Sequence, residues 1–445
     1  MSRKFSEIYS EQHIEQVARE SGFVKRQRKL TPVSFLDSLL FNKYDNKTVS
    51  LNDYSVDIQV RHNTTIKKQS IDERFNECSV EFIRTLLEEQ LEKQVTKPLA
   101  TVCLERFSSV KIKDSTRFQL PASLKDKYPG SGGAASEAGM HIQFEFDIKS
   151  GRVNTLKATD AKRQDWTDAL ETVPDVEEGS LTIRDLGYFS PRVLLDIQTE
   201  RKAYYISRLK PGIKIFTCMA GEFKELDLAK EHQTLQLSNA SWKEIDVYIG
   251  EKYKVPVRLL IELMPEDEIE KRMRKANREA EKKGRILSQR YRAYASLGLF
   301  ITNVPKEWME PQNIRTVYRL RWQIELRFKC WKSLCHVHNV KKMKLHRFET
   351  CLYACLLYIL VNWEISLSLA SACLKKTGLL LSVYKCYKAI LQCSDILREA
   401  LFNGIEKMES YVKKIESIDY RNLLLEKRKG HLALNEILFM FIEPK

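Results

Sequence analysis

Between residues 110 and 208, strand and helix patterns follow one another in an order that few folds accommodate. Runs that alternate apolar and polar residues predict strands, and Ser-Pro before an apolar-periodic run predicts a helix start. The region therefore predicts a mixed α/β core. The expected series is a strand at 110–114, a hairpin over 141–158 turned at Ser150-Gly151, a helix at 161–170, a strand at 180–185, a helix at 190–199 and a strand at 203–208.

Two of these expected strands end on a carboxylate, Asp114 and Asp185. The order of elements matches the ribonuclease-H-like arrangement, in which these two strands are parallel neighbours and their carboxylates meet at one edge of the sheet. Asp147, on a hairpin strand, competes with Asp114 for the first position, and a strand-end Asp taken alone is usually a turn former. We favour Asp114, because it ends the first strand and is followed by Ser and Thr hydroxyls that can support it.

A third carboxylate lies on a helix expected over Tyr318–Lys332, which contains no Pro or Gly and mostly good helix formers. At about 100° per residue, Tyr318, Arg321, Glu325 and Lys332 share a stripe about 60° wide. Apolar residues occupy the adjacent side. The helix is therefore expected to bury one side and to hold Glu325 among cations and a phenol, the alternative being an ordinary amphipathic helix with a solvated polar face.

The chain carries a net charge of +15, from 74 Lys and Arg against 59 Asp and Glu. This balance favours a polyanionic partner, either nucleic acid or an acidic membrane surface. The first twenty residues lack the apolar core of a signal peptide, and the longest apolar run, Cys351–Val361, is too short to span a bilayer. The ten cysteines include no CxxC pair, and the spacing of Cys330, Cys335, His336 and His338 fits no standard zinc finger, which favours reduced thiols in a cytoplasmic protein.

Short helix patterns fill the first 100 residues, beside a basic run at Lys25–Lys29. Helix starts are expected at Thr31-Pro32, at Ser50 and at Thr64-Thr65, and a further helix over Val80–Leu91. Short helices next to a basic run favour a helix-turn-helix-like DNA-binding module. A small helical bundle that binds nothing has the same pattern.

Residues 210–315 interrupt the series with a mostly β insertion. Strand patterns occur at Ile213–Phe216, Leu235–Leu237, Ile245–Ile249 and Val255–Leu263, and Leu297–Thr302 leads back to the core.

A long helix is expected after Pro265, and residues 271–292 hold ten Lys or Arg against only Glu279 and Glu281. This imbalance favours contacts with DNA phosphates over a merely solvated face.

The predicted architecture is thus an α/β mixed, ribonuclease-H-like catalytic core interrupted by a β-rich insertion, with helical terminal regions. The expected parts are a helical N-terminal DNA-binding region at 1–98, the first part of the core at 99–209, the β-rich insertion with its basic helix at 210–296, the second part of the core at 297–372, and a helical C-terminal region suited to dimerisation at 373–445.

The sequence resembles the insertion-sequence-4 family of bacterial DDE transposases over about residues 30–370. Lys113-Asp114-Ser-Thr and Ile183-Arg-Asp185-Leu-Gly-Tyr-Phe-Ser are similar to the regions that carry the family's first and second Asp. Some members have a Trp near the strand before the signature helix that handles a flipped base, whereas Leu297–Thr302 contains none. Four residues match the family's YREK signature without deviation in spacing: Tyr318-x2-Arg321-x3-Glu325-x6-Lys332.

The resemblance implies Mg²⁺-dependent cut-and-paste DNA transposition, by phosphodiester hydrolysis and strand transfer. It implies that Asp114, Asp185 and Glu325 are catalytic and bind two Mg²⁺ ions, with Mn²⁺ as a substitute. The implied phosphate-binding residues are Tyr318, Arg321 and Lys332.

The implied partners are double-stranded DNA, as terminal inverted repeats and as target, and a second copy of the chain in a synaptic complex. No membrane is involved, and the expected location is the bacterial cytoplasm, at the nucleoid. Two alternatives stay open: a catalytically silent, transposase-derived DNA-binding protein, and a ribonuclease-H-like structure-specific DNA nuclease.

Overall fold

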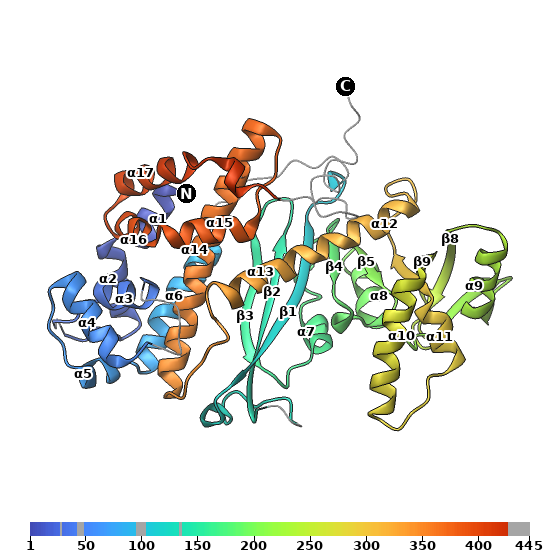
Figure 1. Ribbon diagram of the computed structural model, residues 1–445, viewed down its shortest axis with the longest axis horizontal. Helices are drawn as coiled ribbons and strands as arrows, with labels where there is room; N and C mark the ends of the chain where they lie inside the picture. Colours follow the sequence, from blue (N-terminus) through green and yellow to red (C-terminus); the bar gives the residue numbers. More distant parts are fainter. Residues whose placement is uncertain (27–28, 42–48, 95–103, 133–135, 426–445) are drawn as a thin grey trace. The chain divides into compact units, whose positions relative to one another are not determined.

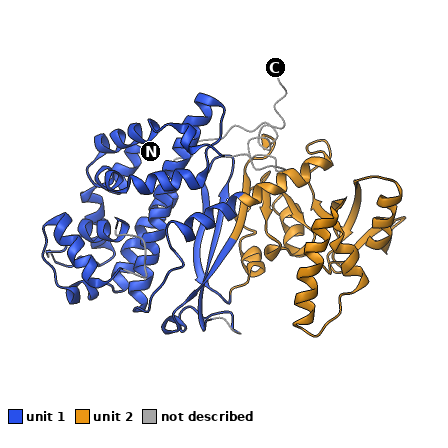
Figure 2. Ribbon diagram, viewed as in Figure 1, with its two compact units in different colours: residues 1–100, 115–162, 323–440 blue, residues 101–114, 163–322, 441–445 orange. Residues whose placement is uncertain are grey.

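The computed structural model describes all residues except 27–28, 42–48, 95–103, 133–135 and 426–445. The chain forms two compact units (Figure 2): unit 1 comprises residues 1–100, 115–162 and 323–440, and unit 2 comprises 101–114, 163–322 and 441–445. The predicted boundary at 98/99, part of the basic run Lys25–Lys29 and the end of the C-terminal region lie outside the described residues.

Unit 2 is built on a mixed sheet (Figure 1). The first part of β1 pairs in parallel with β4, with Val110 opposite Leu181 and Lys113 opposite Arg184. The expectation that the two Asp-bearing strands are parallel neighbours is therefore confirmed. The strands of unit 2 lie in the order β1 (Val110–Leu120), β4 (Leu181–Arg184), β5 (Tyr204–Arg208), β10 (Leu297–Thr302), β9 (Val255–Leu263), β8 (Trp242–Ile249), β6 (Ile215–Met219) and β7 (Glu222–Glu225).

The strands of the 210–315 region extend the sheet of unit 2. Strand β10 pairs antiparallel with β5 on one side and with β9 on the other, so the return of the chain at Leu297–Thr302 is confirmed. The helices of this unit are α7 (Asp165–Glu171), α8 (Pro191–Thr199), α9 (Leu228–Leu237), α10 (Glu266–Glu281), α11 (Gln289–Ala295) and α12 (Pro311–Tyr318), followed by a 3₁₀ turn at Arg319–Arg321.

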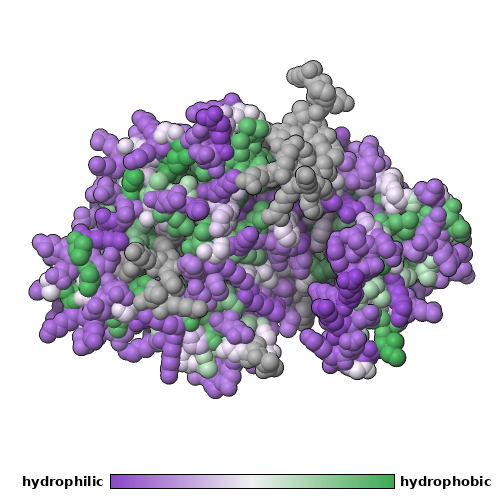
Figure 3. All heavy atoms as spheres, in the orientation of Figure 1, coloured by the Kyte–Doolittle hydropathy of each residue, from purple (hydrophilic) through white to green (hydrophobic). Residues whose placement is uncertain are grey.

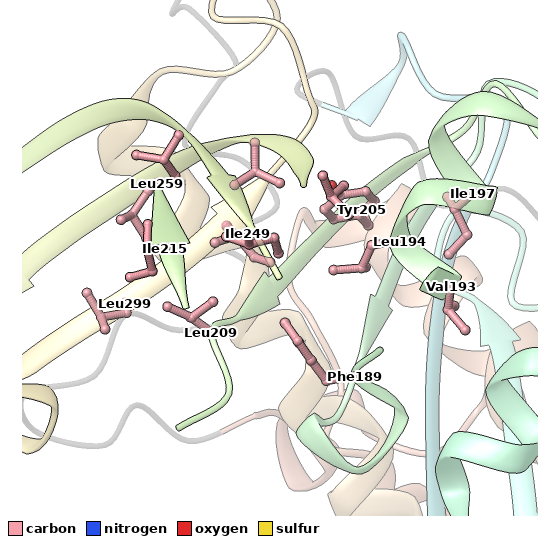
Figure 4. Packing of buried hydrophobic residues seen from close by; sticks show 14 of the residues in the cluster. Phe189, Val193, Leu194, Ile197, Tyr205, Leu209, Ile215, Ile249, Leu259 and Leu299 are labelled. Atoms are coloured by element: carbon pink, nitrogen blue, oxygen red, sulfur yellow. The ribbon is translucent and has the colours of Figure 1, made fainter. Parts of the chain in front are cut away.

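Apolar side chains from one face of this sheet form the core of unit 2 (Figure 4). Leu194 on α8 lies against Tyr205 on β5, and Ile197 of the same helix belongs to the same cluster. Ile249 and Leu259 continue the cluster along the inserted strands. All five side chains are at least 94% buried. The inserted strands therefore share one core with β5. Each fully buried aliphatic side chain of this core stabilises the folded state by about 1.5–3 kcal/mol relative to an exposed one.

Unit 1 combines a β-hairpin with a helical bundle. Strands β2 (Ala138–Asp147) and β3 (Val153–Asp160) form the predicted hairpin, and the second part of β1 belongs to the same unit. Gly151 in the turn has a φ of +73°, and a Cβ there would lie 2.6 Å from a Leu367 methyl group, so this position requires glycine. The Trp363 indole also donates a hydrogen bond to the Gly151 carbonyl at 2.8 Å.

Helix α14 (Leu345–Thr377) is the centre of the bundle. It is the one helix in the described part of the chain that is long and apolar enough to cross a membrane, but 89% of its most apolar window is buried inside the protein. It is therefore a core helix. The other helices of unit 1 are α1 (Ser2–Ile8), α2 (Glu11–Glu20), α3 (Pro32–Phe41), α4 (Leu51–His62), α5 (Lys68–Asp72), α6 (Glu77–Glu92), α13 (Trp322–Ser333, nearly all in this unit), α15 (Val383–Gln392), α16 (Ser394–Phe402) and α17 (Ile405–Glu416).

Local capping chemistry explains which predicted helix starts are correct. Thr31 and Ser34 exchange hydrogen bonds at the start of α3, and Ser50 forms a capping box with Asp53 at the start of α4. The start predicted at Thr64-Thr65 is wrong, because α5 begins only after Lys67.

Three further predictions of secondary structure are wrong. Leu235–Leu237 is the end of α9, which Asp227 caps by accepting hydrogen bonds from two backbone N–H groups. Strand β1 does not stop at Asp114 but continues to Leu120. Tyr318–Lys332 is not one uninterrupted α-helix, because the 3₁₀ turn at Arg319–Arg321 separates α12 from α13.

A buried ion pair in unit 1 generates a stability prediction. Lys4 Nζ lies 2.5 Å from Glu364 Oε1, which also accepts a hydrogen bond from Gln90 at 2.7 Å. Removing one partner leaves a buried charge, so Lys4→Met is expected to lower the free energy of unfolding by about 3 kcal/mol. The double variant Lys4→Met/Glu364→Leu is expected to recover most of this loss in urea unfolding of the full chain.

The matched control is Lys125→Met, which breaks an exposed pair with Glu137 and is expected to change nothing measurable. A double variant no more stable than Lys4→Met would assign the loss to packing instead of to the uncompensated charge.

Candidate active site

Asp114 and Asp185 lie next to each other in unit 2. The parallel pairing ends at Lys113 opposite Arg184, so each Asp is the next residue on its strand. Asp185 directly follows β4 and caps the short 3₁₀ turn Leu186–Tyr188, where its side chain accepts a hydrogen bond from the Gly187 N–H at 3.3 Å. The carboxylates of the two predicted metal ligands therefore meet at one edge of the sheet.

Arg321 binds both carboxylates. Its Nη1 donates to Asp114 Oδ2 at 3.0 Å and lies 3.6 Å from Asp185 Oδ1. The side chains of Arg321 and Asp114 are only 17% and 15% exposed, so the attraction is stronger here than in bulk water. The guanidinium holds together two charges that would otherwise repel each other.

Tyr318 lies one helical turn before Arg321, at the end of α12. Its ring packs edge-on against Phe300 of β10, with ring centroids 5.5 Å apart. Burial raises the pKa of Tyr318 to about 12, against the opposing charge of Arg321. The phenol is therefore protonated at neutral pH and can donate a hydrogen bond to a phosphate oxygen.

Lysines occupy the other face of β1, behind Asp114. Lys113 is 1% exposed; its Nζ lies 2.6 Å from Asp168 Oδ2 and donates to Thr172 Oγ1 at 2.9 Å. Arg163 also donates to Asp168, at 3.2 Å. These contacts hold β1 next to Asp114 in place against α7 and against Thr172, the residue that follows α7.

Glu325 and Lys332 belong to unit 1, on α13. Helix α13 buries Ile324, Phe328 and Trp331, as its apolar stripe predicts, and Glu325 is half-buried. Lys332 Nζ donates to the Arg117 carbonyl of β1 at 3.2 Å, and burial lowers the pKa of Lys332.

Asp147, the alternative first carboxylate, serves its own turn in unit 1. Its side chain accepts hydrogen bonds from the backbone N–H groups of Lys149 and Ser150, both at 3.1 Å, and from the Ser150 hydroxyl at 2.5 Å. These contacts are those of a turn-forming Asp, which supports Asp114 as the site residue.

The chemistry of these residues fits a divalent cation. Two carboxylate oxygens, on Asp114 and Asp185, lie within 3.6 Å of one positively charged nitrogen, so they already converge on a single cation. Hard oxygen donors are the ligands that Mg²⁺ and Mn²⁺ prefer. Within the described ranges, no group of three or more His, Cys, Asp or Glu side chains is placed around one metal position.

Two residues near this site were not predicted from the sequence. Arg208 ends β5, and its charge acts on both Tyr318 and Arg272. Trp322 directly follows Arg321, and its side chain is 52% exposed. Arg208 could have been identified from the sequence, because it is a cation at the end of the strand that follows β4. Trp322 could not, because its exposure depends on where the 3₁₀ turn ends.

Paired carboxylates on adjacent parallel strands, just beyond their last paired residues and with cations beside them, are typical of enzymes that act on phosphodiesters with divalent metal ions. Comparison with known proteins gives the family. The family described as "Transposase DDE domain" matches residues 105–361, which is more than half of the chain. The chain therefore belongs to the DDE transposases, and it is a metal-dependent enzyme that cleaves and joins DNA phosphodiesters.

Named relatives agree with this assignment. The transposase of insertion sequence element IS231F from Bacillus thuringiensis subsp. israelensis is 30% identical over 440 residues, covering 96% of this chain and 91% of that protein. The transposase of IS1151 from Clostridium perfringens is 28% identical over 431 residues, covering 93% and 90%. The resemblance to the insertion-sequence-4 family is thereby confirmed.

Among solved structures, a piggyBac transposase synaptic complex with hairpin DNA is similar at 10% identity and a TM-score of 0.45, covering 96% of this chain and 86% of that one. This likeness is too slight to support a statement about the chain.

The contacts of the two competing Asp residues generate a prediction. Asp147→Ala removes three hydrogen bonds from one turn, so the free energy of unfolding is expected to fall by about 1–3 kcal/mol while metal-dependent DNA cleavage persists. Asp114→Asn is expected to abolish cleavage and to leave a folded protein. Urea unfolding and nicking of a supercoiled plasmid measure the two effects, and the reverse pattern would exchange the two assignments.

Proposed function

We propose that Asp114, Asp185 and Glu325 bind two Mg²⁺ ions, with Mn²⁺ as a substitute, and carry out the cleavage and strand-transfer steps of transposition. The observation that carries this proposal is the convergence of Asp114 and Asp185 on Arg321 where the parallel pairing of β1 with β4 ends, in a chain of the DDE transposase family. The bound ions would activate an attacking oxygen and stabilise the leaving oxygen of an in-line displacement.

The remaining signature residues act on phosphate. Arg321 offers a planar guanidinium that suits a phosphate as well as a carboxylate, and Tyr318 offers a protonated phenol. Lys332 adds a further cation on α13. Trp322 presents an exposed indole beside Arg321, and such a ring can stack on an unpaired base.

The reaction proposed is cut-and-paste transposition. Water attacks the phosphodiester at the transposon end and frees a 3′-hydroxyl, which then attacks the opposite strand to give a hairpin. A second water opens the hairpin, and the 3′-hydroxyl finally attacks the target strand. In each step one P–O bond forms as another breaks, and no cofactor beyond the divalent ions is needed.

The proposed partners are the terminal inverted repeats of the element, a target duplex and a second copy of this chain. The helices of residues 1–98 are assigned to end binding, and residues 373–445 to dimerisation. The proposed core, in two parts at 99–209 and 297–372, is ribonuclease-H-like, with the β-rich insertion at 210–296 between them. The net charge of +15 suits a place on the bacterial nucleoid, in the cytoplasm.

A carboxamide at position 325 tests the proposal. Glu325→Gln keeps the size of the side chain and removes its charge, so cleavage is expected to fall by at least about 10³-fold, as for loss of a group that acts in the transition state. Binding to terminal-repeat DNA is expected to persist. The assay incubates the full chain with labelled end DNA, a target plasmid and Mg²⁺, and resolves cut and joined products on a gel.

The same assay separates the alternatives. Joined products support a transposase, cleavage without joining supports a structure-specific nuclease, and binding without cleavage supports a catalytically silent derivative. A Glu325→Gln protein that cuts at the normal rate would remove Glu325 from the site. The matched control is Glu222→Gln, an exposed residue on β7 of unit 2, which is expected to cut normally.

A further inference from the structure

Helices α10 and α11 form a helical hairpin in unit 2 (Figure 1). The connection between them, residues 282–288, is exposed except for the half-buried Leu287. Gly284 has a φ of +60° there, with open space around its α-carbon. At the tip, Ile286 is 94% exposed, the highest exposure of any large apolar residue in the described chain.

The base of this hairpin is fixed to the sheet. The Arg272 guanidinium donates to the carbonyl oxygens of Ala295 and Leu297, at 3.2 and 2.9 Å. The Tyr294 hydroxyl donates to the Leu209 carbonyl at 2.7 Å. The hairpin is therefore a supported projection with an apolar tip.

The positive charge of the hairpin is concentrated toward the tip. In the first half of α10, Lys271 pairs with Asp267 and Glu268, and Arg274 pairs with Glu270. From Lys275 to the end of the connection at Ser288, the structure shows no ion pair for five exposed cations, and hydrophilic residues dominate the surface over α10 in Figure 3. These cations are Lys275, Arg278, Lys282, Lys283 and Arg285.

The spacing of these cations suits a row of phosphates. Lys275, Arg278 and Lys282 share a stripe about 60° wide and span about 10 Å along the helix. Duplex DNA carries one negative charge per about 1.7 Å of its axis, so a row of this length meets several phosphates.

One cation, Arg208, lies near both the base of the hairpin and the site of the carboxylate pair. Arg272 at the hairpin base lies close enough to Arg208 to interact electrostatically, and Arg208 acts in the same way on Tyr318. All of these residues belong to unit 2. The hairpin base and the carboxylate site therefore share the positive charge of Arg208.

We propose that the α10–α11 hairpin is a DNA-bending element, in which Lys275, Arg278 and Lys282 bind backbone phosphates and Ile286 inserts between base pairs from the minor groove. An apolar side chain flanked by cations is the arrangement by which architectural proteins kink a duplex, by 20–90°. A single isoleucine is too small an apolar surface for a membrane anchor, which favours DNA over an acidic lipid surface. The inference rests on the proposed action on DNA, but it concerns a duplex away from the carboxylates.

The test measures binding and bending without cleavage. The full chain is mixed, in EDTA, with a mixed-sequence duplex of about 40 base pairs, roughly four helical turns. Donor and acceptor dyes at the two ends report bending, and 2-aminopurine in the duplex reports unstacking. Wild-type protein is expected to increase both energy transfer and 2-aminopurine fluorescence.

Two variants separate the wedge from the charges. Ile286→Ala is expected to bind within about threefold of wild type but to lose both signals, since the apolar wedge is what unstacks the bases. The triple variant Lys275→Gln/Arg278→Gln/Lys282→Gln is expected to reduce the slope of log affinity against log salt by up to about 2.7, because each phosphate contact contributes about 0.9. The control Leu237→Ala removes a residue that is 89% exposed on α9 and is expected to behave as wild type.

If Ile286→Ala bends DNA as much as wild type does, Ile286 is not the wedge. If the salt slope of the triple variant is unchanged, these cations do not bind phosphates. Loss of binding to anionic phosphatidylserine vesicles in the triple variant, without any change on DNA, would also overturn the proposal. Failure of the proposed transposition chemistry can be told apart from failure of this inference. It appears only in the Mg²⁺ cleavage assay, where Glu325→Gln is the inactive reference, and not in the bending assay, which contains EDTA.

Discussion

The geometry of the candidate site in unit 2 depends on the ion pairs that Arg321 forms with Asp114 and Asp185. Parallel pairing of β1 with β4 forces two carboxylates together, and like charges at this spacing destabilise the folded state unless a cation lies between them. The guanidinium supplies that cation and at the same time ties the turn after α12 to the sheet. In the proposed reaction a divalent cation would bind the same two carboxylates, which the strand pairing already holds together.

A second layer of charge supports the same strands from behind. Lys113 is buried against Asp168, and Lys111 lies 3.1 Å from Glu177. Parallel strands are covered on both faces, so an apolar residue is the usual occupant of these positions. Ion pairs here are directional, and they hold β1 at one register relative to α7 and its C-terminal extension. Because its register is fixed, β1 places Asp114 beside Asp185. Apolar packing alone would specify this register less strictly.

The sequence predicts the parts of this arrangement that depend on local or periodic signals. The succession of strands and helices along the chain and the caps at Thr31 and Ser50 follow from alternation and hydrogen-bonding side chains. The parallel pairing of the two Asp-bearing strands follows from the match of that succession to a ribonuclease-H-like arrangement. The length of β1 beyond Asp114 was not predictable in this way, because Ser115 and Thr116 suit a turn and a strand equally well. The burial of Lys113 was hidden for another reason: a polar residue at every second position has the pattern of a solvated face, and only its partner Asp168, distant in sequence, shows otherwise.

The ion pairs of the basic helix α10 also decide where the proposed contact with nucleic acid lies, which the number of its cations alone does not. Ten cations against two Glu over residues 271–292 indicate a polyanionic ligand but not a position. The i,i+4 pairs Asp267–Lys271 and Glu270–Arg274 neutralise the first half of α10, and their spacing is visible in the sequence. The attraction for phosphate therefore falls on the last turn and the connection to α11. What the sequence does not show is that Arg272 anchors the base and that Ile286 is exposed at the tip, and these two facts turn a charged helix into a supported wedge.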